Sequence, residues 1–152
     1  MTESPRDRLD SDLKAAMKAG DVTARDTIRF TLSGLKYEEI EKRGALTTEE
    51  EIAFLQRQAK RLSEAIDLYR TGNRPDLADR EAAQLAILQG YLPAALTDDE
   101  VRRLVEQAIA ETGATSVREM GRVMPVAIAR AEGRADGKRL SAAVRDALPK
   151  LT

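Results

Sequence analysis

The sequence contains no histidine, no cysteine and no tryptophan, and aromatic residues make up only 3% of its 152 positions. Without histidine there is no imidazole base and no Ser-His-Asp triad. Without cysteine there is no thiol nucleophile, no disulfide and no Cys/His zinc cluster. We therefore expect no catalytic residues of these classes, no metal site and no cofactor. A core with so few aromatics has to be built from aliphatic side chains, which favour helices when they recur at 3.6-residue spacing.

The chain also lacks a long apolar segment. The longest uncharged stretch, residues 82–97, contains Gln, Gly and Pro and is too short to cross a bilayer. The N-terminal residues have no apolar run of the signal-peptide type. These absences predict a cytoplasmic protein with no membrane partner. The net charge of −1 is too small to indicate a nucleic-acid partner by itself.

Apolar residues at helical spacing predict four helices in the first part of the chain, which glycines or prolines separate. Thr47 and Glu50 form a capping-box pattern that opens the longest of them, and Pro75 stands at the first position of the next. The expected helices cover residues 7–19, 22–43, 48–71 and 75–88.

Three shorter helices are predicted in the rest of the chain, at residues 98–111, 116–131 and 136–148. Two further capping-box patterns begin at Thr97 and Ser116, and Asp136 is the expected cap of the last helix. Pro125 is expected to divide or kink the middle one. We predict an all-α fold with two domains. Residues 1–93 form a hairpin or bundle of longer helices, and residues 94–152 form a small three-helix module.

Three apparent catalytic patterns have simpler explanations. The sequence Gly133-x-x-x-Gly137-Lys138 is one residue short of a Walker loop, and no strand precedes it. Lys138 and Ser141 lie three residues apart on a helix, but nothing in the sequence supplies an oxyanion hole. Acidic residues are dense between Glu38 and Glu51, where exposed helix faces and helix N-termini account for them.

An ordered set of short motifs runs along nearly the whole chain. They are Met17-Lys18-Ala19-x-Asp21, Ile28-Arg29, Glu38-Glu39-Ile40, Leu46-Thr47-x-Glu49-Glu50, Gly72 with Asp76-Leu77, Glu81 to Leu88, Tyr91-Leu92-Pro93, Met120-Gly121-x-Val123-Met124 and Gly133-x-Ala135-Asp136-Gly137. Taken in order, these motifs resemble the YqeY family of small bacterial helical proteins. A second set lies in the tail, at Gly121, Val123, Met124, Gly133, Ala135, Asp136, Val144 and Leu148. This set is similar to the C-terminal domain of the B subunit of glutamine-dependent aminoacyl-tRNA amidotransferase.

The resemblance implies a two-part helical fold whose tail helps to hold tRNA while separate domains carry out the chemistry. It also associates the chain with carbon–nitrogen ligase activity that uses glutamine as amide donor. The kinase-like catalytic part of that B subunit has no counterpart here, so independent ligase activity is not expected.

Two non-catalytic hypotheses remain. In the first, the chain is an accessory protein that binds tRNA or another structured RNA. Its tail has eight cations and four acids between Arg118 and Lys150, a local balance of 8 − 4 = +4, and glycines let backbone approach a phosphate chain closely. The candidate RNA-binding residues are Arg130, Gly133, Arg134, Gly137, Lys138 and Arg139. In the second, the chain is an adaptor that docks on an enzyme of translation through an apolar groove between its two parts, lined by residues such as Met120, Val123 and Met124.

Overall fold

The computed structural model describes residues 3–149, and Lys150 of the basic count lies outside them. The predicted all-α class is confirmed, because the described residues form helices and no strand. The chain divides into two compact units, unit 1 at Met1–Leu92 and unit 2 at Pro93–Thr152. Each unit has its own apolar core.

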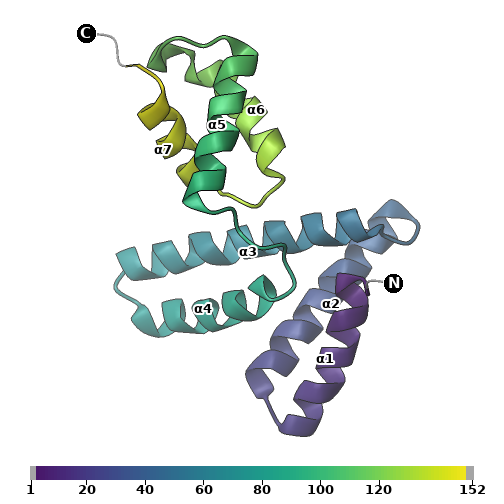
Figure 1. The fold of residues 1–152 in the computed structure, drawn as a ribbon. Helices are drawn as coiled ribbons and strands as arrows, with labels where there is room; N and C mark the ends of the chain where they lie inside the picture. The colour runs from purple at the N-terminus through teal and green to yellow at the C-terminus, as the bar shows by residue number, and fades with distance from the viewer. Residues whose placement is uncertain (1–2, 150–152) are drawn as a thin grey trace. The chain divides into compact units, whose positions relative to one another are not determined.

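Unit 1 consists of two antiparallel helical hairpins (Figure 1). Its helices are α1 at Pro5–Ala19, α2 at Val22–Lys42, α3 at Thr48–Thr71 and α4 at Pro75–Gln89. A left-handed Gly20, with φ of 71°, ends α1, and the Asp21 side chain then caps α2. Both signals agree with the helix ends that the sequence predicts.

The core of unit 1 brings α2 and α3 into close contact at one glycine. Leu9, Leu35 and Leu55 are fully buried there, and the Phe54 ring of α3 packs against α2 at Gly34. A β-carbon built on Gly34 would lie 2.3 Å from Cζ of Phe54. The missing side chain of Gly34 therefore makes room for the buried phenylalanine ring.

Unit 2 packs three helices around an aliphatic core. They are α5 at Asp98–Thr112, α6 at Met120–Ala131 and α7 at Gly137–Ala147, with a short 3-10 turn η1 at Val117–Glu119 before α6. The capping box predicted at Thr97 is present, with Thr97 and Glu100 exchanging side-chain and backbone hydrogen bonds. Val105, Val123 and Val144, one from each helix, are fully buried in the core.

The division expected at Pro125 is absent, since Pro125 lies inside an uninterrupted α6. The predicted helix of residues 116–131 is divided earlier, where the η1 turn gives way to α6 at Met120. The Glu119 carboxylate accepts hydrogen bonds from the backbone N–H groups of Thr115 and Ser116, which fixes the turn. With α6 beginning at Met120, proline removes only the helical bond to the Gly121 carbonyl.

Replacing Gly34 by alanine is expected to destabilise the protein by about 1–3 kcal/mol, because the new methyl group overpacks the contact with Phe54. Urea unfolding of the full chain, followed by circular dichroism, measures the change. Gly121→Ala is the matched control, since no atom lies within 4 Å of its added carbon. Alanine should there stabilise α6 by up to about 1 kcal/mol. A Gly34→Ala variant as stable as Gly121→Ala would contradict the contact.

Candidate functional site

The candidate RNA-binding residues gather around the connection between α6 and α7. Glu132 ends α6 in a left-handed conformation with φ of 49°, and Gly133 follows with φ of 76°. The Asp136 carboxylate then accepts the Arg139 backbone N–H at 2.8 Å and starts α7. Gly137 stands in open space, with no atom near the position of an added β-carbon. The loop therefore exposes Gly133 and Gly137 at its two ends, while the Arg134 backbone between them is bonded to Ala131 and Leu96.

Arg130, in the last turn of α6, is held by side chains of α5. Its guanidinium forms an ion pair with Glu111 and donates a hydrogen bond to Oε1 of Gln107 at 3.3 Å. Both charged side chains of the pair are more than 40% exposed. An ion pair this exposed contributes little to stability, because water screens it.

The other cations of the loop also have partners. Nε of Arg134 donates to the Ala94 carbonyl at 2.8 Å, and Nη2 of Arg139 lies 2.9 Å from Oδ1 of Asp98. Lys138 is exposed at the start of α7 and also has a partner. Arg130, Arg134 and Arg139 thus hold the loop against α5 and the segment before it.

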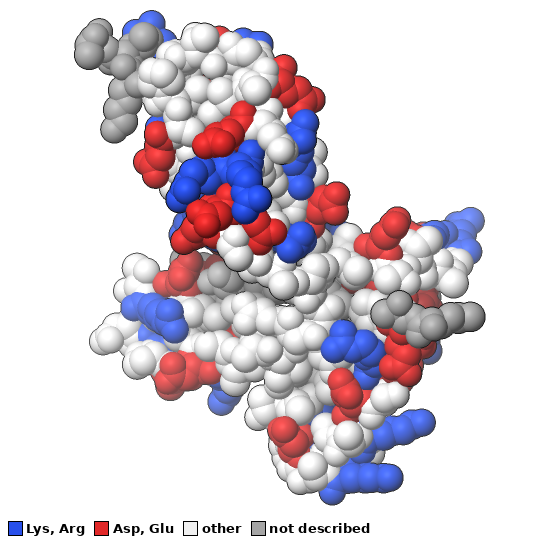
Figure 2. Space-filling view, in the orientation of Figure 1, with Lys and Arg blue, Asp and Glu red and all other residues white. Residues whose placement is uncertain are grey.

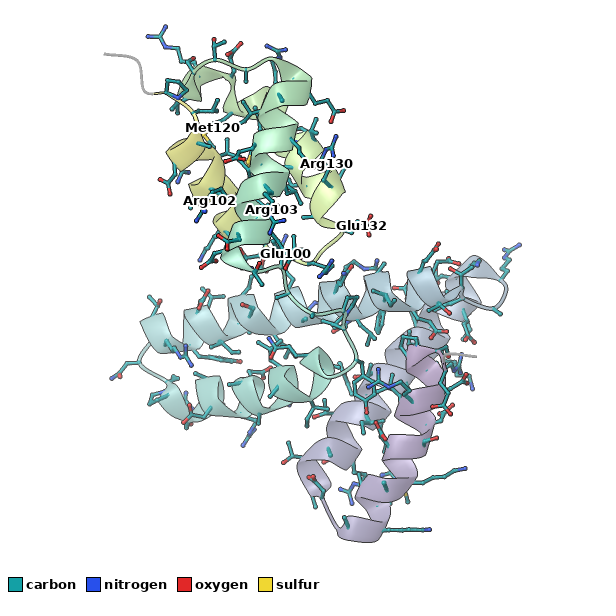
Figure 3. The ribbon with its side chains drawn as sticks, viewed as in Figure 1. Glu100, Arg102, Arg103, Met120, Arg130 and Glu132 are labelled. Carbon is teal, nitrogen blue, oxygen red and sulfur yellow. The ribbon has the colours of Figure 1, made fainter. Side chains whose placement is uncertain are left out.

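On the face that Figure 2 draws, unit 2 carries a mixture of charges rather than a basic patch. Figure 2 shows blue and red side chains interleaved on its visible face. Figure 3 labels Arg102 and Arg103 on α5, which the count from Arg118 onward did not include. Nη1 of Arg102 lies 3.1 Å from Asp99. In the sequence, these two arginines appear as an Arg-Arg pair about one helical turn after the Thr97 capping box.

The apolar residues of the α6 motif belong to the core. Val123 is fully buried, and Met120 and Met124 are partly buried against the same core cluster. Val123 is thus closed to a partner, while Met120 and Met124 keep part of their surface outside the core. The exposed apolar side chains lie elsewhere, and those of α2 are Val22, Phe30, Tyr37 and Ile40.

The dense carboxylates of α2 and α3 include one structural residue. Glu51 is only 6% exposed, and its Oε1 accepts the Arg6 backbone N–H at 3.0 Å. It therefore caps the start of α1 from the first turn of α3, where sequence reasoning assigned it to solvent. Within residues 3–149 no three acidic side chains are grouped closely enough to hold a metal ion.

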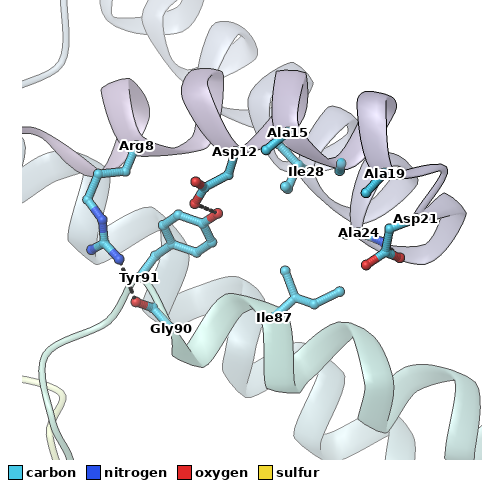
Figure 4. A pocket seen from close by; sticks show the side chains of 11 residues that line it. Arg8, Asp12, Ala15, Ala19, Asp21, Ala24, Ile28, Ile87, Gly90 and Tyr91 are labelled. Atoms are coloured by element: carbon cyan, nitrogen blue, oxygen red, sulfur yellow. Dashed lines mark hydrogen bonds between the residues drawn. The ribbon is translucent and has the colours of Figure 1, made fainter.

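Unit 1 contains a cleft that closes on Tyr91, just after α4 (Figure 4). The Tyr91 hydroxyl donates to Oδ2 of Asp12, and Arg8 stacks over the ring at 4.9 Å. Nη2 of Arg8 also donates to the Gly90 carbonyl at 3.0 Å. Burial raises the pKa of the Tyr91 hydroxyl above its usual range, and the hydrogen bond to Asp12 raises it further. The phenol is thus a fixed donor at neutral pH.

Comparison with known proteins gives one family and two relatives. The family model described as Yqey-like protein matches residues 6–148. A protein of Pyrenophora tritici-repentis named "Altered inheritance of mitochondria protein 41, mitochondrial" is 34% identical over 122 residues, which cover 77% of this chain and 67% of the relative. A protein of the same name from Lachancea thermotolerans is 36% identical over 87 residues, which cover 55% and 46%.

The predicted cytoplasmic location is wrong in the light of these relatives, because both are named as mitochondrial proteins. The prediction used the absence of an apolar N-terminal run, which argues only against a secretory signal. Mitochondrial transit peptides are amphipathic and basic rather than apolar, so that absence has no bearing on them. No helix within residues 3–149 is long and apolar enough to cross a membrane.

The capping carboxylates of unit 2 predict a loss of stability in acid. Backbone hydrogen bonds lower the pKa of Glu100 at Thr97 and of Glu119 at Thr115. A lowered folded-state pKa gives stability that is complete above the unfolded value of about 4.3 and is lost as pH falls through the folded value. Urea unfolding at a series of pH values measures this loss.

The double variant Glu100→Gln/Glu119→Gln should lose less free energy of unfolding at low pH than the unmodified chain. Glutamine still accepts the hydrogen bonds but does not titrate. Glu106→Gln, at an exposed position in the middle of α5, is the matched control and should leave the acid limb unchanged. If the double variant lost stability in acid as steeply as the unmodified chain, the capping carboxylates would not be its source.

Proposed function

The chain belongs to the Yqey-like protein family, and from that premise we propose that it is a non-catalytic accessory protein that binds structured RNA, tRNA in particular, through unit 2. The proposal assigns the contact to Arg130, Gly133, Arg134, Gly137, Lys138 and Arg139. It places the chain beside a glutamine-dependent amidotransferase reaction as a module that holds RNA, with the chemistry carried out by other chains.

The gathering of these cations on one loop is the observation that carries the proposal. Arg130 and Arg139 flank the loop on α6 and α7, and Arg134 lies within it. Gly133 and Gly137 are exposed at the two ends of the loop. Arginine binds phosphate through two parallel N–H groups, which fits a sugar-phosphate backbone that follows the loop.

The strength of RNA binding depends on the contacts that the arginines already make in the free protein. The pairs of Arg130 with Glu111 and of Arg139 with Asp98 are both exposed. Such pairs contribute about 0–1 kcal/mol, while release of counterions from RNA favours an exchange of carboxylate for phosphate. Glu111 and Asp98 thus act as internal competitors of the RNA.

Replacing Arg130, Arg134 and Arg139 together by alanine should weaken tRNA binding and reduce the slope of log affinity against log salt. Removing one cation that binds a phosphate reduces that slope by roughly one unit. Filter binding or fluorescence anisotropy with labelled tRNA, at several salt concentrations, measures both quantities. Arg25→Ala and Arg57→Ala in unit 1 are the matched controls and should leave both unchanged.

Removing a carboxylate that competes with the RNA should raise tRNA affinity, which gives a test in the opposite direction. Glu111→Gln frees Arg130 from its ion pair and should raise tRNA affinity about 2- to 5-fold, which corresponds to the value of an exposed pair. Glu106→Gln removes the same charge from a position away from the loop, so it controls for the change in net charge. An affinity that is unchanged in Glu111→Gln and in the triple arginine variant would reject the loop. No binding of tRNA at low salt would reject RNA binding altogether.

The exposed face of α2 supports a second candidate function, an adaptor that docks on an enzyme of translation. Phe30, Tyr37 and Ile40 are 71%, 62% and 64% exposed. Their spacing of seven and three residues places them on one side of the helix. Solvent-exposed aromatic side chains of this kind are typical of protein-binding surfaces.

Phe30→Asp combined with Tyr37→Asp should abolish the binding of such a partner, because both charges fall within the apolar contact. Partner binding is measured by co-purification, as the recovery of a translation protein in stoichiometric amount with the tagged chain. Ile128→Asp is the matched control, since Ile128 is an exposed apolar residue of unit 2. A partner that stays bound to the α2 double variant would exclude this face.

A further inference from the structure

The cleft of unit 1 has the form of a trough with a volume of about 430 Å³ (Figure 4). Ligand pockets in proteins typically enclose 300–1,000 Å³. Helix α1 forms one wall, the start of α2 and the end of α4 form the others, and Tyr91 closes one end. The middle of the trough is lined by apolar side chains, namely Ala15, Ala16, Ala19, Ala24, Ile28 and Ile87.

A carboxylate stands at each end of this apolar trough. Figure 4 shows Asp12 beside Tyr91 at one end and Asp21 at the other, with Ala15 and Ala19 between them. Because α1 rises 1.5 Å per residue, the seven residues from Asp12 to Ala19 separate these ends by roughly 10 Å. The two charges are thus far apart, along a wall that offers only methyl groups.

Each carboxylate has a structural hydrogen bond but keeps capacity for a ligand. Asp12 accepts the Tyr91 hydroxyl through Oδ2, and Asp21 accepts the Ala24 backbone N–H through Oδ1 at 3.1 Å. An ionised carboxylate has about four acceptor sites on its two oxygens. These bonds fix the orientation of both groups and leave further sites for a cation.

Arg8, the cationic residue of the lining, belongs to the Tyr91 end of the trough. It lies on the outer side of the Tyr91 ring in Figure 4, where it stacks on the ring and donates to the Gly90 carbonyl. Because the Arg8 guanidinium is held by the Tyr91 ring and the Gly90 carbonyl, the groups left to meet a ligand are two carboxylates and an aliphatic surface. A ligand that complements it has two positive charges joined by an apolar chain.

We propose that this trough binds an elongated aliphatic dication of the diamine or polyamine class, with one ammonium group on Asp12 and the other on Asp21. The methylene chain lies along Ala15, Ala19 and Ile87, where its removal from water favours binding. The site belongs to unit 1 and does not depend on RNA binding by unit 2.

A series of α,ω-diaminoalkanes of increasing length tests the proposal by isothermal titration calorimetry on the full chain without RNA. Affinity should pass through a maximum at the chain length whose two ammonium groups reach both carboxylates. The monoamine with the same number of carbons should bind at least 10-fold more weakly, because it can use only one of them. Affinity that does not depend on length or on the second ammonium group would overturn the proposal.

Charge-removing variants locate the site without unfolding it. Asp12→Asn still offers an oxygen to the Tyr91 hydroxyl, and Asp21→Asn still caps α2, because asparagine is as good a cap as aspartate. Each should reduce affinity for the optimal diamine at least 10-fold and abolish the preference for its length. Asp10→Asn, two residues away on an exposed position of α1, is the matched control and should bind as the unmodified chain does.

A steric variant separates the trough from general attraction between the cation and the acidic residues of the chain. Ala15→Leu fills the apolar wall with a good helix former and leaves both carboxylates in place. It should reduce affinity at least 10-fold, with the thermal midpoint of unfolding unchanged. Equal affinities in Ala15→Leu, Asp12→Asn and Asp10→Asn would show that the diamine binds elsewhere and would overturn the assignment.

Discussion

The contact of Tyr91 with α1 is the constraint on which the arrangement of unit 1 depends. Tyr91 is 8% exposed, follows the last helix of the unit and bonds Asp12 on the first, 79 residues earlier. Arg8 reinforces the junction from the other side of the ring. The junction joins the two hairpins together with the Phe54 contact at Gly34 and the bond of Arg6 to Glu51, and it also forms one end of the trough. The same bond therefore serves the fold and shapes the proposed ligand site.

Unit 2 combines local capping contacts with polar contacts between segments that are distant in the sequence. Capping carboxylates begin α5 and the turn before α6, and arginines of the α6–α7 loop bond to α5 and to the Ala94 carbonyl. These arginines hold the loop in place as long as no anion competes for them. A proposed RNA site made of such residues is one in which the contacts of the free protein are exchanged for phosphate contacts.

The all-α class and most helix ends could be predicted from the sequence, because glycines such as Gly20 and capping boxes such as that of Thr97 act over a few residues. The partners of Arg130 could not, since Glu111 is 19 residues away and becomes a neighbour only when α5 and α6 pack. The burial of Glu51 and the trough between α1, α2 and α4 were missed for the same reason. Pro125 shows the limit of local signals, because a favourable start at Met120 outweighs the absence of one helical hydrogen bond.

The junction at Tyr91 also has a consequence for the order of folding. Each hairpin of unit 1 joins helices across a short connection, so its contacts form between residues that are near in the chain. Local contacts of this kind form early, whereas a contact between residues 12 and 91 requires the closure of a long loop. On the ribosome, α1 emerges well before Tyr91 does. The first helix of the chain therefore reaches its final packing only after the last helix of unit 1 has been synthesised.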